Sequence, residues 1–170
     1  MKKAFIIACL FFMTALTARS QTKEETLQWF EQNGKSLGSF YTSAWVTSTG
    51  MGTLNYSVEI KGDTLVIDAL QDNNRTITKS LLKDIYVEDP EKLEEDCMSR
   101  RNGVCDSPVK MVRIKEQKGH YKYNGYTNKV TMTDTGFWFE YLDREKGMRV
   151  LKAIMHLAKL SGAKENKQIF

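Results

Sequence analysis

The sequence is poor in histidine, cysteine and proline, and it has no long apolar run after its first 20 residues. The 170 residues include two histidines, three cysteines and two prolines. Neither histidine has the spacing of a metal site, so we predict no metal and no cofactor. A later membrane-spanning helix is excluded because crossing a bilayer takes about 20 apolar residues. Glycine-rich phosphate loops are also lacking, and we predict no catalytic residues and no enzymatic activity.

Excess charge is lacking as well once the first 20 residues are set aside. The whole chain carries a formal net charge of +4, but the first 20 residues hold Lys2, Lys3 and Arg19 and no acidic residue. Without them, 22 basic residues face 21 acidic ones, a net charge of about +1. A nearly neutral domain is not typical of nucleic-acid binding. The hydrophobic share of 41% and charged share of 27% indicate an ordinary globular protein, in length a single domain.

Residues 1–20 have the plan of a secretory signal peptide. Lys2 and Lys3 precede an apolar stretch, and Ala18-Arg19-Ser20 places small residues at the −3 and −1 positions before Gln21. We therefore expect cleavage near Ser20-Gln21. The mature chain is expected to be exported, either periplasmic or fully secreted.

Two cysteines, Cys97 and Cys105, remain after removal of the leader. Export permits a disulfide, and Asn102-Gly103 between them is a strong tight-turn signal. A hairpin brings two Cα atoms within the ~4.4–6.8 Å that a disulfide requires, and closing this loop contributes about 2.5 kcal/mol in the chain-entropy model. Metal binding is the rival interpretation, and it is weaker because no histidine or further cysteine lies nearby.

A helix is predicted at each end of the mature chain. Thr22 and Glu25 form a capping box for a helix over 23–37. Asp143 is a candidate N-cap for the last helix, and Gly162 stands where a terminating glycine belongs. The last helix carries an apolar stripe of Val150, Leu151, Ile154, Leu157 and Ala158.

Short strands fill the region between the helices. Residues 39–52 are expected to be irregular, and the acidic run 88–96 a solvated loop. Alternation and turn residues predict strands over 54–60, 64–70, 75–82, 83–87, 109–115, 121–126, 129–133 and 137–142. Helix, about seven antiparallel strands and helix predict an α+β fold, an open barrel with the last helix covering one end.

This order of elements resembles a pleckstrin-homology-like (PH-like) barrel. The opening stretch 22–30 and the closing stretch 149–164 are similar to the ends of a group of small secreted bacterial proteins with that fold. The resemblance implies one PH-like domain over 21–170. The acidic loop 88–108, which carries the disulfide, is an insertion particular to this sequence. The resemblance implies no catalytic or binding residue, because the group has no established biochemical function.

Two features suggest a recognition surface. Arg100 and Arg101 lie at the tip of the loop that the disulfide closes, and such a preorganised loop lowers the ordering cost of binding. Tyr121, Tyr123 and Trp138 belong to an aromatic-rich pair of strand regions, and exposed aromatics stack on partners. The same features also suit a stabilised surface loop and cross-strand packing. We predict a binding or interaction module for a protein or small-molecule ligand; the alternative is a carrier of a small apolar ligand inside the barrel.

Overall fold

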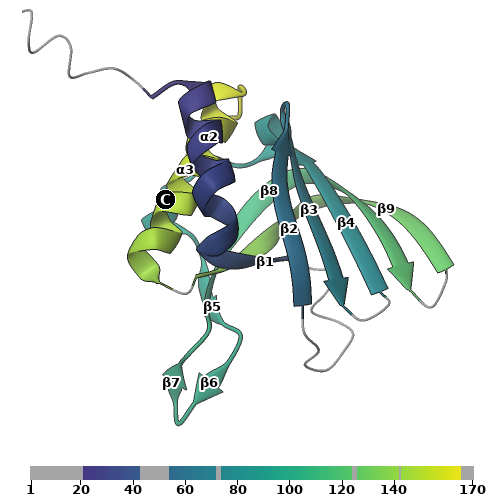
Figure 1. The fold of residues 1–170 in the computed structure, drawn as a ribbon, viewed down its shortest axis with the longest axis vertical. Helices are drawn as coiled ribbons and strands as arrows, with labels where there is room; N and C mark the ends of the chain where they lie inside the picture. Colours follow the sequence, from purple (N-terminus) through teal and green to yellow (C-terminus); the bar gives the residue numbers. More distant parts are fainter. Residues whose placement is uncertain (1–20, 43–53, 72–73, 124–125, 142, 166–170) are drawn as a thin grey trace, which may run out of the picture.

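The computed structural model describes residues 21–42, 54–71, 74–123, 126–141 and 143–165 (Figure 1). The predicted leader, 1–20, lies outside these residues. The elements in chain order are α2 (Lys23–Asn33), η1 (Gly34–Ser36), β1 (Gly38–Thr42), β2 (Leu54–Lys61), β3 (Thr64–Gln71), β4 (Asn74–Leu81), η2 (Leu82–Asp84), η3 (Pro90–Lys92), β5 (Glu95–Cys97), β6 (Arg100–Arg101), β7 (Val104–Cys105), β8 (Pro108–Tyr123), β9 (Tyr126–Tyr141) and α3 (Arg144–Leu160).

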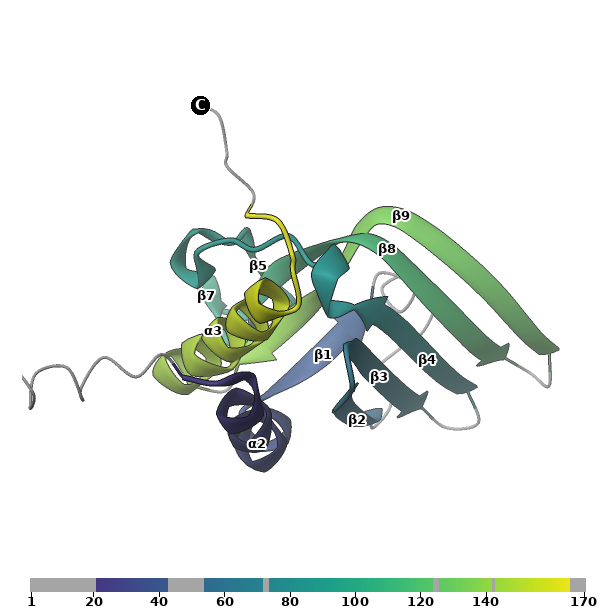
Figure 2. The ribbon, with the colours of Figure 1, turned by 90° about the horizontal axis from the view of Figure 1, so that it is seen from above.

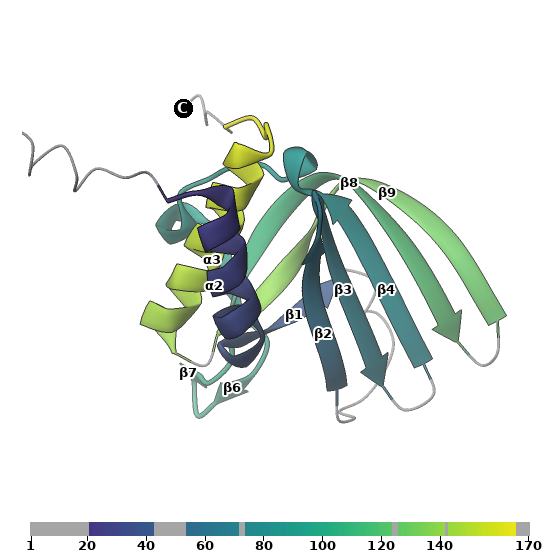
Figure 3. The same ribbon diagram turned by 45° about the horizontal axis from the view of Figure 1, so that its top comes forward.

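A curved antiparallel sheet of seven strands forms the body of the molecule. Its order is β1-β9-β8-β4-β3-β2, with β5 added on β8, while β6 and β7 form a separate two-stranded hairpin. The sheet curls until β1 and β2, at its two ends, come into contact. Helices α2 and α3 pack against each other at one end of this open barrel (Figures 1 and 3). The predicted α+β open barrel with a closing helix is confirmed.

The core is concentrated where α3 meets the sheet. All five residues of the predicted α3 stripe are fully buried: Val150, Leu151, Ile154, Leu157 and Ala158. They lie in one cluster with five aromatic residues, Phe30, Phe40, Phe137, Phe139 and Tyr141. The ring centroid of Phe40 is 5.6 Å from that of Phe137 and 4.9 Å from that of Phe139. Burying these side chains contributes about 1.5–3 kcal/mol for each large one, so this end holds most of the packing energy.

Both helix starts follow the sequence prediction. Thr22 accepts from the backbone N–H of Glu25, whose carboxylate accepts from the Thr22 N–H, so the capping box is complete. Asp143 caps α3 by accepting from the N–H of Lys146. Gly162 has a φ of 87°, the left-handed conformation that ends a helix without a Cβ clash. Helix α2 ends at Asn33 and continues as η1 to Ser36, close to the predicted end at 37.

The long strands β8 and β9 bend sharply, and Figure 2 shows both turning together away from the helices. Before the bend Val112 and Ile114 are buried; beyond it the inward side passes to Gln117 and Gly119. In β9 the bend contains Asp134, whose φ is 48°. Across the bend the buried residues of β8 change from even-numbered to odd-numbered positions, so the set of side chains that faces inward changes there.

Three sequence predictions are corrected here. The segment expected to be irregular from residue 39 begins with strand β1, which pairs with β9 through backbone hydrogen bonds that its glycine, serine and threonine content does not signal; its remainder, 43–52, lies outside the described residues. The strand predicted over 83–87 is instead the helix η2 followed by two isolated bridges, Ile85 to Ile114 and Val87 to Glu165. The sequence predicts four strands over 109–115, 121–126, 129–133 and 137–142. The structure has two long strands there, β8 and β9, because glycine inside a paired strand bends the strand without ending it; residues 124, 125 and 142 lie outside the described residues.

Candidate functional site

A disulfide-closed hairpin projects from the body of the protein beside the start of α3 (Figures 1 and 3). Cys97 and Cys105 are bonded with their Cα atoms 5.9 Å apart, which confirms the predicted pair. At the turn Asn102 and Gly103 have φ values of 53° and 79°, the two positive values that a type I′ hairpin turn requires. The turn and the disulfide together fix the backbone of this loop.

The hairpin exposes apolar and cationic side chains and buries few of them. Arg100 and Arg101 are exposed, and the Arg101 side chain, 85% exposed, reaches Asp106 at 3.7 Å. Met98 and Val104 are 48% and 69% exposed. A rigid loop whose side chains do not serve the core is typical of a recognition element.

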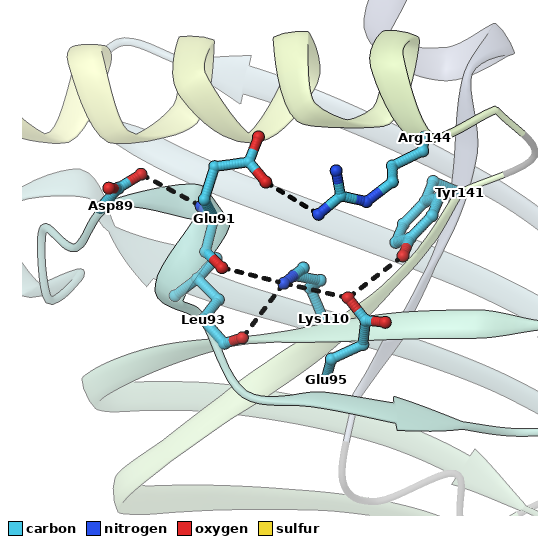
Figure 4. A network of polar contacts seen from close by, with 7 residues as sticks. All are labelled: Asp89, Glu91, Leu93, Glu95, Lys110, Tyr141 and Arg144. Atoms are coloured by element: carbon cyan, nitrogen blue, oxygen red, sulfur yellow. Dashed lines mark hydrogen bonds and ion pairs between the residues drawn. The ribbon is translucent and has the colours of Figure 1, made fainter.

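The base of the hairpin is fixed by a buried lysine, Lys110, shown in Figure 4. Its side chain is 3% exposed, and its ammonium lies 3.0 Å from the Glu95 carboxylate and 3.2 Å from the Leu93 carbonyl oxygen. Glu95 also accepts a hydrogen bond from the Tyr141 hydroxyl at 3.3 Å. Removing the cation would leave buried carbonyl oxygens unpaired, so Lys110 holds β5, and with it the hairpin, against β8.

This network shifts the pKa values of its members. The hydrogen bond from Lys110 holds the pKa of Glu95 below its usual value, with a smaller opposing effect from burial. Burial raises the pKa of Tyr141, and the neighbouring Glu95 charge raises it further. At neutral pH Glu95 is therefore an acceptor only and Tyr141 a donor, which is the arrangement that the hydrogen bond needs.

The acidic run 88–96 is only in part the solvated loop that the sequence predicts: Asp89, Glu91, Glu94, Glu95 and Asp96 are exposed, but the segment is anchored at other positions. Pro90 and Leu93 are buried, and the Glu88 side chain is 6% exposed beside Arg113. The Arg144 guanidinium pairs with Glu91 at 2.8 Å, which ties this segment to α3. Sequence reasoning missed the network because its cations come from β8 and α3, far along the chain, and no local pattern connects them.

The predicted interaction residues lie at two ends of the sheet. Arg100 and Arg101 are in the hairpin next to the start of β8, whereas Tyr121 and Tyr123 are near the other end of that strand. The side chains of the two tyrosines lie outside the described residues. Trp138 is half-buried on the outer side of β9, opposite Met111 of β8 and so nearer the hairpin. The five residues do not form one continuous patch.

Two serine patterns in the sequence resemble catalytic motifs by letters alone. Gly34-Lys35-Ser36-Leu37-Gly38 fits Gly-x-Ser-x-Gly, but Ser36 ends a 3₁₀ helix instead of a strand, and its hydroxyl donates to the Asn33 carbonyl at 3.1 Å. Ser80-Leu81-Leu82-Lys83 fits Ser-x-x-Lys, but Ser80 is buried inside the barrel and Lys83 is exposed. Neither pattern has the structural context that its chemistry requires.

The remaining titratable residues are dispersed. In the described ranges no three His, Cys, Asp or Glu side chains gather in a way that would hold a metal ion. His120 is exposed on β8, and the His156 Nε2 lies 3.0 Å from the Gln21 carbonyl oxygen. Among the residues that the structure describes, neither helix has the length and apolar character needed to cross a membrane.

Comparison with known proteins found no matching family model, no matching curated protein and no matching solved structure. The α+β open barrel thus stands on this structure alone, and the PH-like assignment stays a prediction.

Proposed function

We propose that this protein is an exported, non-enzymatic interaction module that binds a protein partner through the hairpin Cys97–Cys105. One observation carries the proposal: a covalently closed, conformationally fixed loop presents Met98, Arg100, Arg101 and Val104 to solvent. The body of the protein supplies a rigid support for the loop through Lys110. The barrel itself is proposed to be a PH-like domain over 21–170.

The composition of the hairpin surface favours a protein as the partner. Arginine is enriched among residues that dominate binding energy, and methionine adapts its shape to different apolar surfaces. The backbone of the hairpin is already ordered, so the binding free energy does not have to offset the entropy lost in ordering it. An acidic surface with a small apolar depression would match this set of side chains.

Export is the second part of the proposal, and a mass measurement tests it. The disulfide supports it, because such bonds persist in oxidising compartments. We expect the protein recovered from its own host to begin at Gln21 and to gain two protons on reduction. An intact leader, or free thiols in the native protein, would contradict export.

A site-specific crosslinking experiment tests the hairpin. A photoreactive phenylalanine analogue at Val104, 69% exposed, is expected to give one discrete protein adduct in the native host. Arg100→Glu with Arg101→Glu should abolish the adduct. The control, Lys79→Glu with Lys122→Glu, changes the net charge equally at two exposed sheet positions and should leave it intact. No adduct from Val104, or equal loss in both variants, would refute the proposed surface.

The second candidate, a carrier of a small ligand inside the barrel, is favoured by two buried polar atoms. Thr78 Oγ1 and Gln117 Oε1 have no hydrogen-bond partner within the described part of the chain, although their residues are 1% and 0% exposed. A ligand with a polar group would satisfy them. Saturable binding of a hydrophobic fluorescent probe, one per chain and weakened by Gln117→Leu, would support a carrier.

A further inference from the structure

A groove runs between α2 and α3, along the line where the two helices pack against each other. Its volume is about 440 Å³, within the range of ligand-binding clefts. The lining residues are Gln21, Thr26, Trp29, Arg149, Lys152, Ala153 and His156. Trp29 packs partly against the core, so an aromatic face is held firmly in one wall of the groove.

The groove offers hydrogen-bond donors and positive charge, and none of its lining residues is acidic. Among the described residues the indole N–H of Trp29 has no hydrogen-bond partner, and Lys152 forms no ion pair. Arg149 is paired with Glu145 on its own helix. The Thr26 hydroxyl is already used, since it donates to the Thr22 carbonyl at 2.8 Å. Such a donor set matches a ligand rich in acceptors, which for a charged ligand means an anion such as a carboxylate or a phosphate.

A second hollow continues the first along α3. It is lined by Glu91, Arg144, Glu145, Met148, Arg149 and Lys152, has a volume of about 470 Å³, and shares Arg149 and Lys152 with the groove. Its acidic residues are both paired, Glu91 with Arg144 and Glu145 with Arg149. From Met148 to His156 the helix rises about 12 Å, the length of about four residues of extended peptide.

We propose that this groove binds an acidic, extended segment of a partner protein, with carboxylates on Arg149 and Lys152 and one apolar side chain against Trp29. Charge complementarity favours an acidic ligand. Arg149 and Lys152 line both of the adjoining hollows, so an extended chain reaches both hollows, whereas a compact ligand fills only one. The site lies on the helices and not on the hairpin, so it is independent of the function proposed above.

Nuclear magnetic resonance of the ¹⁵N-labelled protein tests this proposal. The probe is a capped pentapeptide of four glutamates around a central phenylalanine, and the Trp29 indole signal is assigned with Trp29→Phe. We expect a saturable shift of that signal at millimolar peptide. The matched peptide with four glutamines should bind about tenfold more weakly, as should Arg149→Gln with Lys152→Gln.

The control variant is Lys79→Gln with Lys122→Gln, which removes the same charge from exposed sheet positions and should change the affinity less than twofold. Equal weakening in both variants would mean unspecific attraction and would overturn the proposal. A Trp29 signal that does not shift would overturn it too. If phenylacetate bound as tightly as the peptide, the ligand of the groove would be a small carboxylate and not a peptide segment, and the proposal would be overturned.

Discussion

Gly147 shows how tightly the start of α3 is packed against the sheet. A Cβ atom at this position would lie 2.3 Å from the Cβ and 2.9 Å from the Cγ of Tyr141. The Gly147 N–H also donates to the Asp143 carbonyl at 2.8 Å, so the helix backbone has little freedom to retreat. The close approach depends on the absence of a side chain.

Replacing Gly147 with alanine should therefore reverse the usual helix preference. In an exposed helix Gly→Ala stabilises by up to about 1 kcal/mol, whereas here we expect a loss of about 1–3 kcal/mol from overpacking. Urea unfolding measures the difference. Lys152→Ala, exposed on the same helix, should stay within about 0.5 kcal/mol of the wild type. A Gly147→Ala variant as stable as the wild type would contradict this packing.

Single residues differ in how far their environment follows from the sequence. The burial of the α3 stripe follows from helical periodicity, and the structure confirms it. Alternation places Phe137, Phe139 and Tyr141 on one face of their strand, and the structure shows that this face is the buried one. Lys110 lies on the same face of β8 as the buried Val112 and Ile114, an unusual place for a lysine, and Val109 next to it is equally buried. The burial of Lys110 depends on β5 and η3 closing over it, and no short-range pattern contains that information.

At the scale of elements, the contact between β5 and β8 is sensitive to acid. The pKa of Glu95 in the folded protein lies below its value in the unfolded chain, because Lys110 donates to the ionised carboxylate. Folding then favours the deprotonated form. The stability that this pair contributes is fully present above the unfolded pKa of about 4.3 and is lost as pH falls through the lower folded value.

Urea unfolding of the wild type and Glu95→Gln between pH 7 and pH 3 measures this effect. The wild type should be the more stable at pH 7, and the difference should shrink towards pH 3. Glu94→Gln, an exposed neighbouring carboxylate, serves as the control and should show no such trend. If the difference in unfolding free energy between the wild type and Glu95→Gln did not change with pH, the contact of Lys110 with Glu95 would not stabilise the protein through the charge of Glu95.

The elements that the sequence predicts best are those with local signals. Capping residues define both helix starts, and Asn102-Gly103 defines the hairpin turn. Strand β1 was missed because its stability comes from pairing with β9, about 100 residues later along the chain. Glycine and threonine near the bend of β8 and β9 suggested strand ends, but pairing between two long strands outweighs these local preferences.

At the scale of the whole molecule, burial is uneven. The half of β9 that pairs with β1 is largely buried, whereas Tyr126 to Thr131 are six consecutive exposed residues. The helices and the core cluster lie at the first half, and the second half extends away from them (Figure 2). Local stability should follow this gradient, because few apolar contacts hold the distal half.

Amide hydrogen exchange should reveal the gradient directly. We expect the amides of residues 126–131 to exchange at least tenfold faster than those of 137–141, although both segments are paired with β8. Mass spectrometry of peptic fragments gives the rates. Uniform protection along β9 would mean that the strand opens only with the whole protein.

The bend at Asp134 also makes the length of the distal sheet independent of the residues that form the core around α3. Beyond that point, removing two residues from each of β8 and β9 keeps every remaining side chain on its own face and leaves the packing around α3 as it is. The projecting half is thus a part whose reach can be lengthened or shortened in steps, while the end that holds the helices and the hairpin stays constant.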